Sequence, residues 1–261
     1  MQYENLVYTR KRIVSSAYID STVKLGIAPA VNLVQDNMTE CYGMLHCDGV
    51  TYQKLNVFWA FTKIKVKFEK RPVWKDEIVA KTFPAAASGF RANVNSIFTD
   101  TDGNTLYTAN QEMCVLDFEN HRPVKLSTLP FPQENFPPAV FAEPFEKISV
   151  DLSESDFAFD QVIRSTMIDM SHHMTNNEYI KLALNTFSDE FFQTHEVKAL
   201  EGHYTGECKE GQVLSVYNHD CGNGEYIIKI FEGGKFNAGC AGNDEVASGR
   251  AVFEMKIAFA C

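Results

Sequence analysis

The side chains best suited to chemistry in this sequence lie in its second half. Asp169 and His173 stand close together in a polar segment, residues 169–179. A carboxylate and an imidazole that meet in a fold can activate water, one as general base and the other assisting it. We therefore predict an acid–base site that includes Asp169 and His173.

The polar segment also has the features of a helix start. Thr175 and Glu178 have the spacing of a capping box, so we predict a helix from about Asn176 over residues 176–192. A helix start leaves N–H groups unpaired and carries partial positive charge. Such a group of amides can polarise a carbonyl and stabilise an oxyanion next to His173.

The elements that position these residues occur twice along the chain. Each half predicts a strand, a long helix and several antiparallel strands, so we expect an α+β fold of two units that form a pseudo-dimer. The predicted strands are residues 3–14, 55–68, 77–84, 90–100 and 105–118 in the first half, and 157–165, 197–208, 212–218, 224–231 and 247–259 in the second; the first long helix is 27–42.

The two halves differ in their reactive groups. Asp20 aligns with Asp169, but the first copy has no histidine near it, and residues 75–78 align opposite residues 210–213. Duplication followed by loss of the reactive groups from one copy explains this asymmetry. We therefore expect the chemistry to be confined to the second half.

A proline- and phenylalanine-rich stretch, residues 129–146, separates the halves and suits neither a helix nor a strand. We expect it to be an ordered strap whose phenylalanines pack along the surface. The predicted organisation is an N-terminal domain over residues 1–130, a linker over 131–150 and a C-terminal domain over 151–261.

Composition excludes several classes of function. The formal net charge is −10, which disfavours nucleic acid and anionic membranes as partners. No apolar run reaches the roughly 18 residues that cross a bilayer, and the start lacks a secretory signal, so we expect a cytoplasmic protein. The seven cysteines are scattered without a CxxC pair, and His172 and His173 would point to opposite faces of a strand, so no metal site is expected.

Nearly the whole chain resembles the acyl-ACP thioesterases of plants and bacteria, including residues 71–77 and 121–124 in the first half. Their catalytic domain has an Asp-x-Asn-x-His motif ahead of a helix with Asn-Asn and Tyr, and a Tyr-x-x-Glu-Cys strand follows. The matching residues here are Asp169, His173, Asn176, Asn177, Tyr179, Tyr204, Glu207 and Cys208. This chain departs from the pattern at Ser171, where the family usually has Asn, and serine offers only a short hydroxyl.

The resemblance implies two tandem hot-dog domains and hydrolysis of acyl-ACP to free fatty acid, without metal or cofactor. Glu207 would activate water with help from His173, while Asn176 and Asn177 would bind the thioester at the helix start and Asp169 would hold its neighbours. The acyl pocket would lie in the N-terminal domain, around residues 31–42.

Two residues of the predicted site keep alternative roles. Ser171 is either catalytic, orienting water or thioester, or only a capping residue. Cys208 is either a nucleophile with His173 as its base, or a buried small side chain. We rank the covalent route second, because a neighbouring Glu207 raises the pKa of the thiol.

A basic run in the first half could bind the acidic acyl carrier protein with its acyl-phosphopantetheine thioester. Its members include Lys63, Lys65, Lys67 and Arg71, and the three lysines alternate along one strand face. The alternative is a solvated edge strand protected by lysines. Whether two chains form a homodimer is left open.

Three other functions fit the same residues. The nearest is an acyl-CoA thioesterase on the same fold. A non-catalytic acyl-thioester binding module is suggested by Ser171, and a metal-free hydratase is the third.

Overall fold

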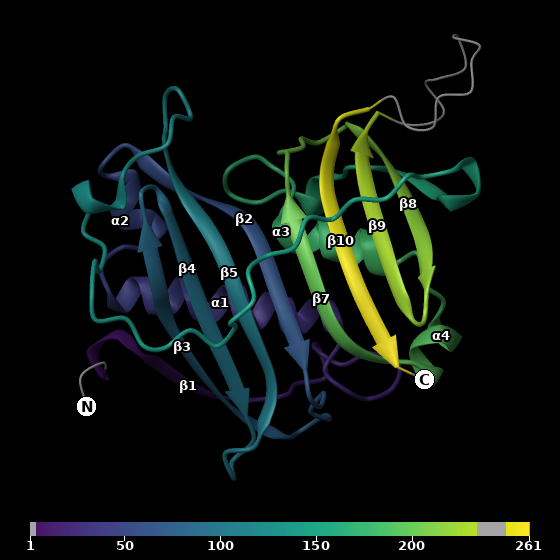
Figure 1. Ribbon diagram of the computed structural model, residues 1–261, viewed down its shortest axis with the longest axis horizontal. Coiled ribbons are helices and arrows are strands. Elements are labelled where there is room, and N and C mark those ends of the chain that lie inside the picture. The colour runs from purple at the N-terminus through teal and green to yellow at the C-terminus, as the bar shows by residue number, and fades with distance from the viewer. Residues whose placement is uncertain (1–3, 234–248, 261) are drawn as a thin grey trace. The chain divides into compact units, whose positions relative to one another are not determined.

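The computed structural model describes residues 4–233 and 249–260 (Figure 1). Cys240, Cys261 and the predicted strand start at Ala247 lie outside the described residues. The chain divides into two compact units, Met1–Phe145 and Glu146–Cys261. Within the described ranges, no helix is both long enough and apolar enough to cross a membrane.

The first unit is one long helix packed on an antiparallel sheet. Its described strands follow the order β1-β3-β4-β5-β2 across the sheet, and α1 lies on one face (Figure 1). The elements are β1 (Tyr8–Ile13), α1 (Ile27–Met44), α2 (Gly49–Gln53), β2 (Val57–Phe68), β3 (Glu77–Ser88), β4 (Arg91–Thr99) and β5 (Thr105–Asp117).

The second unit repeats this plan with a shorter helix. Its described strands follow the order β7-β10-β9-β8-β6, again antiparallel. The elements are β6 (Phe157–Val162), α3 (Asn176–Leu184), α4 (Asp189–Thr194), β7 (Glu196–Tyr204), β8 (Val213–Gly222), β9 (Glu225–Glu232) and β10 (Ala251–Ala260). The predicted α+β class is confirmed in both units.

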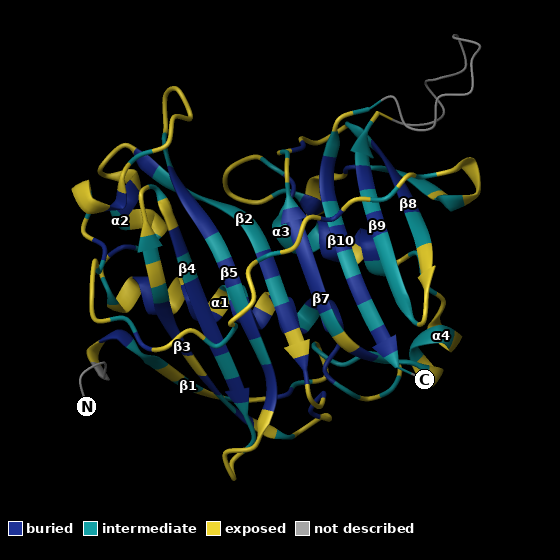
Figure 2. Cartoon of the chain, in the orientation of Figure 1, coloured by how far each residue is buried: buried dark blue, intermediate teal, exposed yellow. Residues whose placement is uncertain are grey.

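Helical spacing of apolar residues explains how α1 meets its sheet. Val31, Val34, Met38 and Cys41 recur at the spacing of one helix face, and all four are buried. Along β4 and β5, buried positions alternate with less buried ones, as expected for a sheet covered by a helix on one face (Figure 2). The predicted helix is confirmed and extends two residues farther than expected, to Met44.

The second predicted helix is broken in two, so the prediction of one continuous helix over 176–192 is wrong. α3 ends at Leu184, and α4 begins at Asp189 after Ser188, whose hydroxyl accepts from the Phe191 N–H at 3.1 Å. A serine that caps a new helix start competes with continuation of the old helix. The hydroxyl of Thr186 in the break also accepts from the Asn218 side chain at 2.9 Å.

The proline-rich stretch packs against the first unit. It contains no α-helix or strand, and Phe131 is buried against Tyr42 and Trp59, with ring centroids 5.7 and 5.6 Å away. Farther on, the Nζ atoms of Lys63 and Lys65 each lie 5.4 Å from the Phe145 ring centroid. The aromatic side chains of this stretch therefore complete the core of the unit and cover one face of its sheet.

The core of the first unit contains unpaired polar atoms. Both side-chain polar atoms of Gln111 and the hydroxyls of Tyr42 and Tyr52 are buried and have no hydrogen-bond partner among the described residues. An unsatisfied buried polar group costs about 1–3 kcal/mol. Stability alone therefore does not explain why these residues occupy the core.

Replacing Phe131 by alanine should lower the free energy of unfolding by about 3 kcal/mol, because a buried aromatic ring is lost from the core. Urea denaturation followed by circular dichroism measures this change. Phe136→Ala is the control, since Phe136 is only partly buried against the same cluster. Equal, small effects of the two substitutions would show that the stretch is only a tether.

Candidate active site

A tight turn ahead of α3 holds three of the predicted site residues. The Asp169 carboxylate accepts from the backbone N–H of Ser171 at 2.8 Å and from its hydroxyl at 2.5 Å. His172 has a φ of +63°, and the Asp169 N–H donates to the His173 carbonyl at 2.9 Å. Asp169 therefore fixes the turn that presents His173.

Glu207 and Cys208 lie in the segment that follows β7. The prediction that this strand runs to Cys208 is wrong, since β7 ends at Tyr204. Beyond it, the N–H groups of Thr205 and Gly206 share the Val252 carbonyl at 3.0 and 3.2 Å. This sharing ends the regular strand ladder, so Glu207 projects from a loop.

One backbone hydrogen bond joins this loop to the turn ahead of α3. The Met174 N–H donates to the Cys208 carbonyl at 2.8 Å. Because His173 precedes Met174 and Glu207 precedes Cys208, their side chains become neighbours. The Nε2 atom of His173 lies 3.5 Å from a carboxylate oxygen of Glu207.

Ser171 connects the other ring nitrogen of His173 to Asp169. Its hydroxyl oxygen lies 3.4 Å from the Nδ1 atom of His173. Because the hydroxyl hydrogen is donated to Asp169, the oxygen offers a lone pair to Nδ1 and favours a proton there. The contacts thus run from Asp169 through Ser171 and His173 to Glu207. The side chains of His173 and Glu207 are 24% and 48% exposed to solvent.

The start of α3 is not closed by the predicted capping box. Thr175 is the N-cap residue but its side chain accepts no capping hydrogen bond, and the Glu178 carboxylate accepts from Lys181 at 2.6 Å instead. The prediction of a reciprocal box is wrong because Lys181 offers Glu178 a charged partner one turn along the same helix. No side chain therefore caps the amides at Asn176 and Asn177.

Asn177 contributes a second unpaired group beside these amides. Its side-chain oxygen is buried and has no hydrogen-bond partner among the described residues. Asn176 is partly exposed. The beginning of α3 thus combines amides that no side chain caps with a polar side chain whose acceptor is unused.

Cys208 is buried, and burial raises the pKa of its thiol. Tyr179 matches the family motif but has no assigned role in the predicted site, and the structure places its buried side chain against this loop. The Tyr179 hydroxyl donates to the Gly206 carbonyl at 3.3 Å and also interacts with the Cys208 thiol. Sequence patterns alone missed this contact, because Gly206 and Cys208 lie far from Tyr179 along the chain.

The first unit contains the same turn with different side chains. Asp20 accepts from the N–H and the hydroxyl of Thr22 at 2.9 and 2.6 Å, and Val23 has a φ of +62°. The Leu25 N–H donates to the Pro72 carbonyl at 2.7 Å, which corresponds to the bond from Met174 to Cys208. Lys24 therefore stands where the second unit has His173.

By the same correspondence, Arg71 stands where the second unit has Glu207. Its guanidinium forms an ion pair with Asp20 and donates to the Leu25 carbonyl at 3.2 Å. Farther along, the predicted alignment of the two halves is wrong by one residue. The Lys75 N–H donates to the Val14 carbonyl, and the Gly211 N–H donates in the same way to the Ile163 carbonyl. Lys75 therefore corresponds to Gly211 and not to Glu210. Both residues have a positive φ. A glycine at such a position indicates this conformation in the sequence, whereas a lysine does not.

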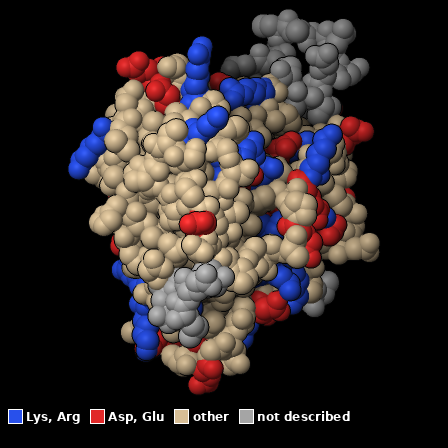
Figure 3. Space-filling view, turned by 60° about the vertical axis from the view of Figure 1, so that its left-hand side comes forward, with Lys and Arg blue, Asp and Glu red and all other residues tan. Residues whose placement is uncertain are grey.

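Arg71 does not fit the predicted docking surface. It is only 4% exposed, and its guanidinium is directed to Asp20, so a partner protein cannot reach it. Lys65 donates to the Pro144 carbonyl at 2.8 Å, and Lys67 forms a 2.9 Å ion pair with Glu69. On the face shown in Figure 3, lysine and arginine side chains lie singly or in small groups among acidic ones.

Comparison with solved structures shows which fold the chain shares. An acyl-ACP thioesterase from Bacteroides thetaiotaomicron matches with a TM-score of 0.83 at 16% identity, covering 100% of both chains. The 12:0-ACP thioesterase from Umbellularia californica matches with a TM-score of 0.80 at 16% identity, covering 97% of both chains. The predicted fold of two tandem hot-dog units is thereby confirmed.

Sequence comparison gives the family. Oleoyl-acyl carrier protein thioesterase 1 of Arabidopsis thaliana is 22% identical over 235 residues, 81% of this chain and 63% of the relative, so the chain spans less than two thirds of that relative's length. The model of the acyl-ACP thioesterase N-terminal domain matches residues 5–128, and that of the C-terminal domain matches residues 152–254. The chain therefore belongs to the acyl-ACP thioesterase family.

Proposed function

We propose that this protein hydrolyses acyl-ACP thioesters and releases free fatty acid. The observation that carries the proposal is the pair of Glu207 and His173, held 3.5 Å apart beside a helix start whose amides no side chain caps. Relatives that are named acyl carrier protein thioesterases support the substrate class. The reaction would terminate fatty acid synthesis by removing the acyl chain from its carrier.

In this mechanism Glu207 is the general base. Its carboxylate takes a proton from water, and the oxygen of that water attacks the thioester carbonyl carbon. The amides of Asn176 and Asn177 stabilise the oxyanion that forms, since the helix start provides N–H groups and partial positive charge. The carbon–sulfur bond then breaks, and a proton passed through His173 neutralises the departing phosphopantetheine thiolate.

Asp169 and Ser171 act by positioning His173. Asp169 holds the turn, and the Ser171 hydroxyl favours a proton on Nδ1 of His173. Nε2 is then the nitrogen that faces Glu207 and exchanges protons during the reaction. A serine can therefore serve at the position where the family usually has asparagine.

Cys208 is a structural residue in this mechanism. A covalent route would need its thiolate, and burial raises the pKa of the thiol, which disfavours that form. The carbonyl of Cys208 has a separate role, because it accepts the hydrogen bond from Met174.

We assign catalysis to the C-terminal domain, residues 151–261, and the acyl-chain pocket to the N-terminal domain, residues 1–130, joined through 131–150. Lys63, Lys65 and Lys67 share one face of β2 and would dock the acidic carrier protein there. A cytoplasmic location and the association of two chains stay predictions of the sequence.

Glu207→Gln and His173→Ala should each lower kcat/KM for acyl-ACP by about 100-fold or more, because each removes a group that handles protons. Steady-state assays of released free acid measure the effect. Glu210→Gln is the matched control, since Glu210 is an exposed glutamate in the same loop. Full activity of the Glu207 variant would rule out the general-base role.

Cys208→Ala should keep kcat/KM within about tenfold of the parent, because only packing changes. Stopped-flow measurement of the first turnover should show no burst of released carrier thiol. A loss as large as that of Glu207→Gln, together with a burst in the parent enzyme, would favour the covalent route.

Acyl-ACP should be hydrolysed with a higher kcat/KM than acyl-CoA of the same chain, because the carrier protein adds contacts that CoA lacks. The two substrates are compared in parallel at one ionic strength. Equal or faster turnover of acyl-CoA would instead support the acyl-CoA thioesterase. No turnover of either substrate would support a non-catalytic binding module.

A further inference from the structure

Three of the buried unpaired polar side chains of the first unit, Tyr42, Tyr52 and Gln111, come from elements that build one core. Tyr42 from α1 and Tyr52 from α2 belong to one buried cluster with Val94 of β4. Gln111 of β5 lies directly opposite Val94 on one side and Ile64 on the other. Opposite residues of an antiparallel pair share a face, so Gln111 points to the same helix-covered side as Val94.

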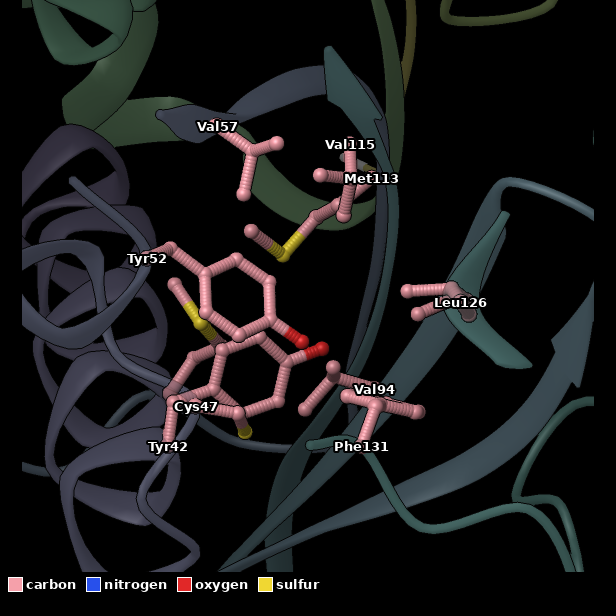
Figure 4. Packing of buried hydrophobic residues seen from close by; sticks show 11 residues of the cluster. Tyr42, Cys47, Tyr52, Val57, Val94, Met113, Val115, Leu126 and Phe131 are labelled. Atoms are coloured by element: carbon pink, nitrogen blue, oxygen red, sulfur yellow. The ribbon is translucent and has the colours of Figure 1, made fainter. Parts of the chain in front are cut away.

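Burial of these side chains is complete or nearly so. The exposed fractions are 1% for Tyr42 and 0% for Tyr52 and Gln111. In Figure 4 the hydroxyls of Tyr42 and Tyr52 point in the same direction, away from their helices and toward the side of Val94 and Leu126. Burial also raises the pKa of both tyrosines, so each hydroxyl keeps its proton and stays a donor.

The second unit has an apolar residue where the first has Gln111. Gln111 lies opposite Ile64 in the first unit, and Ile257 lies opposite Leu200 in the second. A pair of aromatic rings on the same two strands supports this correspondence: Phe68 with Tyr107 in the first unit, and Tyr204 with Phe253 in the second. Ile257 is completely buried. The fold therefore does not require an amide at this position, and Gln111 is a particular feature of the first unit.

Gln111, Tyr42 and Tyr52 together offer donors and an acceptor in a closed apolar interior. Buried polar groups in native proteins are nearly always hydrogen-bonded, and a hydrocarbon chain cannot bond them. A hydroxyl group can, because it accepts from an O–H or N–H donor and donates to an amide oxygen. The group thus has the chemistry to recognise one alcohol function inside the core.

We propose that the interior between α1, α2 and the sheet of the first unit binds an acyl chain that carries a hydroxyl group, with Gln111, Tyr42 and Tyr52 as its hydrogen-bond partners. The proposal rests on the proposed function in taking the ligand to be an acyl chain. A site of this kind discriminates against the plain chain, because a plain chain leaves the protein's polar groups unpaired.

The test is a binding measurement on free fatty acids, which needs no hydrolysis. Isothermal titration calorimetry compares hexadecanoic acid with its monohydroxy isomers, and dodecanoic acid with its own. At least one hydroxy isomer should bind about tenfold or more tightly than the parent acid. Equal or weaker binding of every isomer would overturn the proposal and leave water as the partner of these groups.

Three variants locate the effect. Gln111→Ile, which introduces the residue type of Ile257, and Tyr52→Phe, which removes one oxygen, should each reduce the preference for the hydroxy isomer by about threefold or more. Asn95→Leu is the matched control. Asn95 is equally buried, with both polar atoms unpaired, but it neighbours Val94 in β4 and so faces the opposite side of the sheet.

The control variant should keep the parent preference. An unchanged preference in both Gln111→Ile and Tyr52→Phe, with circular dichroism showing folded protein, would overturn the assignment to these residues. If Gln111→Ile does not fold, Tyr52→Phe alone tests the assignment, since this substitution removes one oxygen and keeps the buried ring. Preference for hydroxy acids without any thioester hydrolysis would contradict the proposed function alone, and hydrolysis without that preference would contradict this inference alone.

Discussion

A single backbone hydrogen bond, from the Met174 N–H to the Cys208 carbonyl, determines the geometry of the candidate site. It joins the turn before a helix to the loop after a strand, two segments that are far apart in sequence. Since the residue before each partner projects a side chain from the same junction, His173 and Glu207 meet there. This bond therefore holds Glu207 next to His173.

The first unit shows that the junction is a property of the fold and not of the chemistry. Its bond from Leu25 to Pro72 and the turn at Asp20 repeat the same backbone geometry. The side chains at the two reactive positions are basic, Lys24 and Arg71, and the buried guanidinium is paired with Asp20. An arginine in this place stabilises the turn electrostatically, whereas the glutamate of the second unit stays half exposed and free to act on water.

Sequence periodicity predicted most elements of the fold, because α1 and the strands bury one face each and therefore repeat with a period of 3.6 or 2. It failed where local hydrogen bonds compete with periodicity. Ser188 starts a new helix inside an apolar pattern, and the shared carbonyl of Val252 ends β7 before Glu207. Lys181 donates a hydrogen bond to the Glu178 carboxylate, so Glu178 does not form the predicted capping box.

The candidate site was predictable in its members but not in its connections. Residue types and the family resemblance indicated Asp169, His173 and Glu207, since acid and histidine side chains are suited to proton transfer. The bridging position of Ser171 could not be predicted, because it depends on the left-handed backbone at His172 that folds the turn back on Asp169. The burial of Arg71 was hidden as well, since its partner Asp20 is far away in sequence.

The most direct measurement is a crystal structure of the Glu207→Gln variant with a bound acyl-ACP substrate. The thioester oxygen should lie within hydrogen-bond distance of the Asn176 or Asn177 N–H, with a water molecule between the substituted side chain and the carbonyl carbon. A thioester bound away from the start of α3, or a carbonyl carbon in contact with the Cys208 sulfur, would contradict the general-base mechanism.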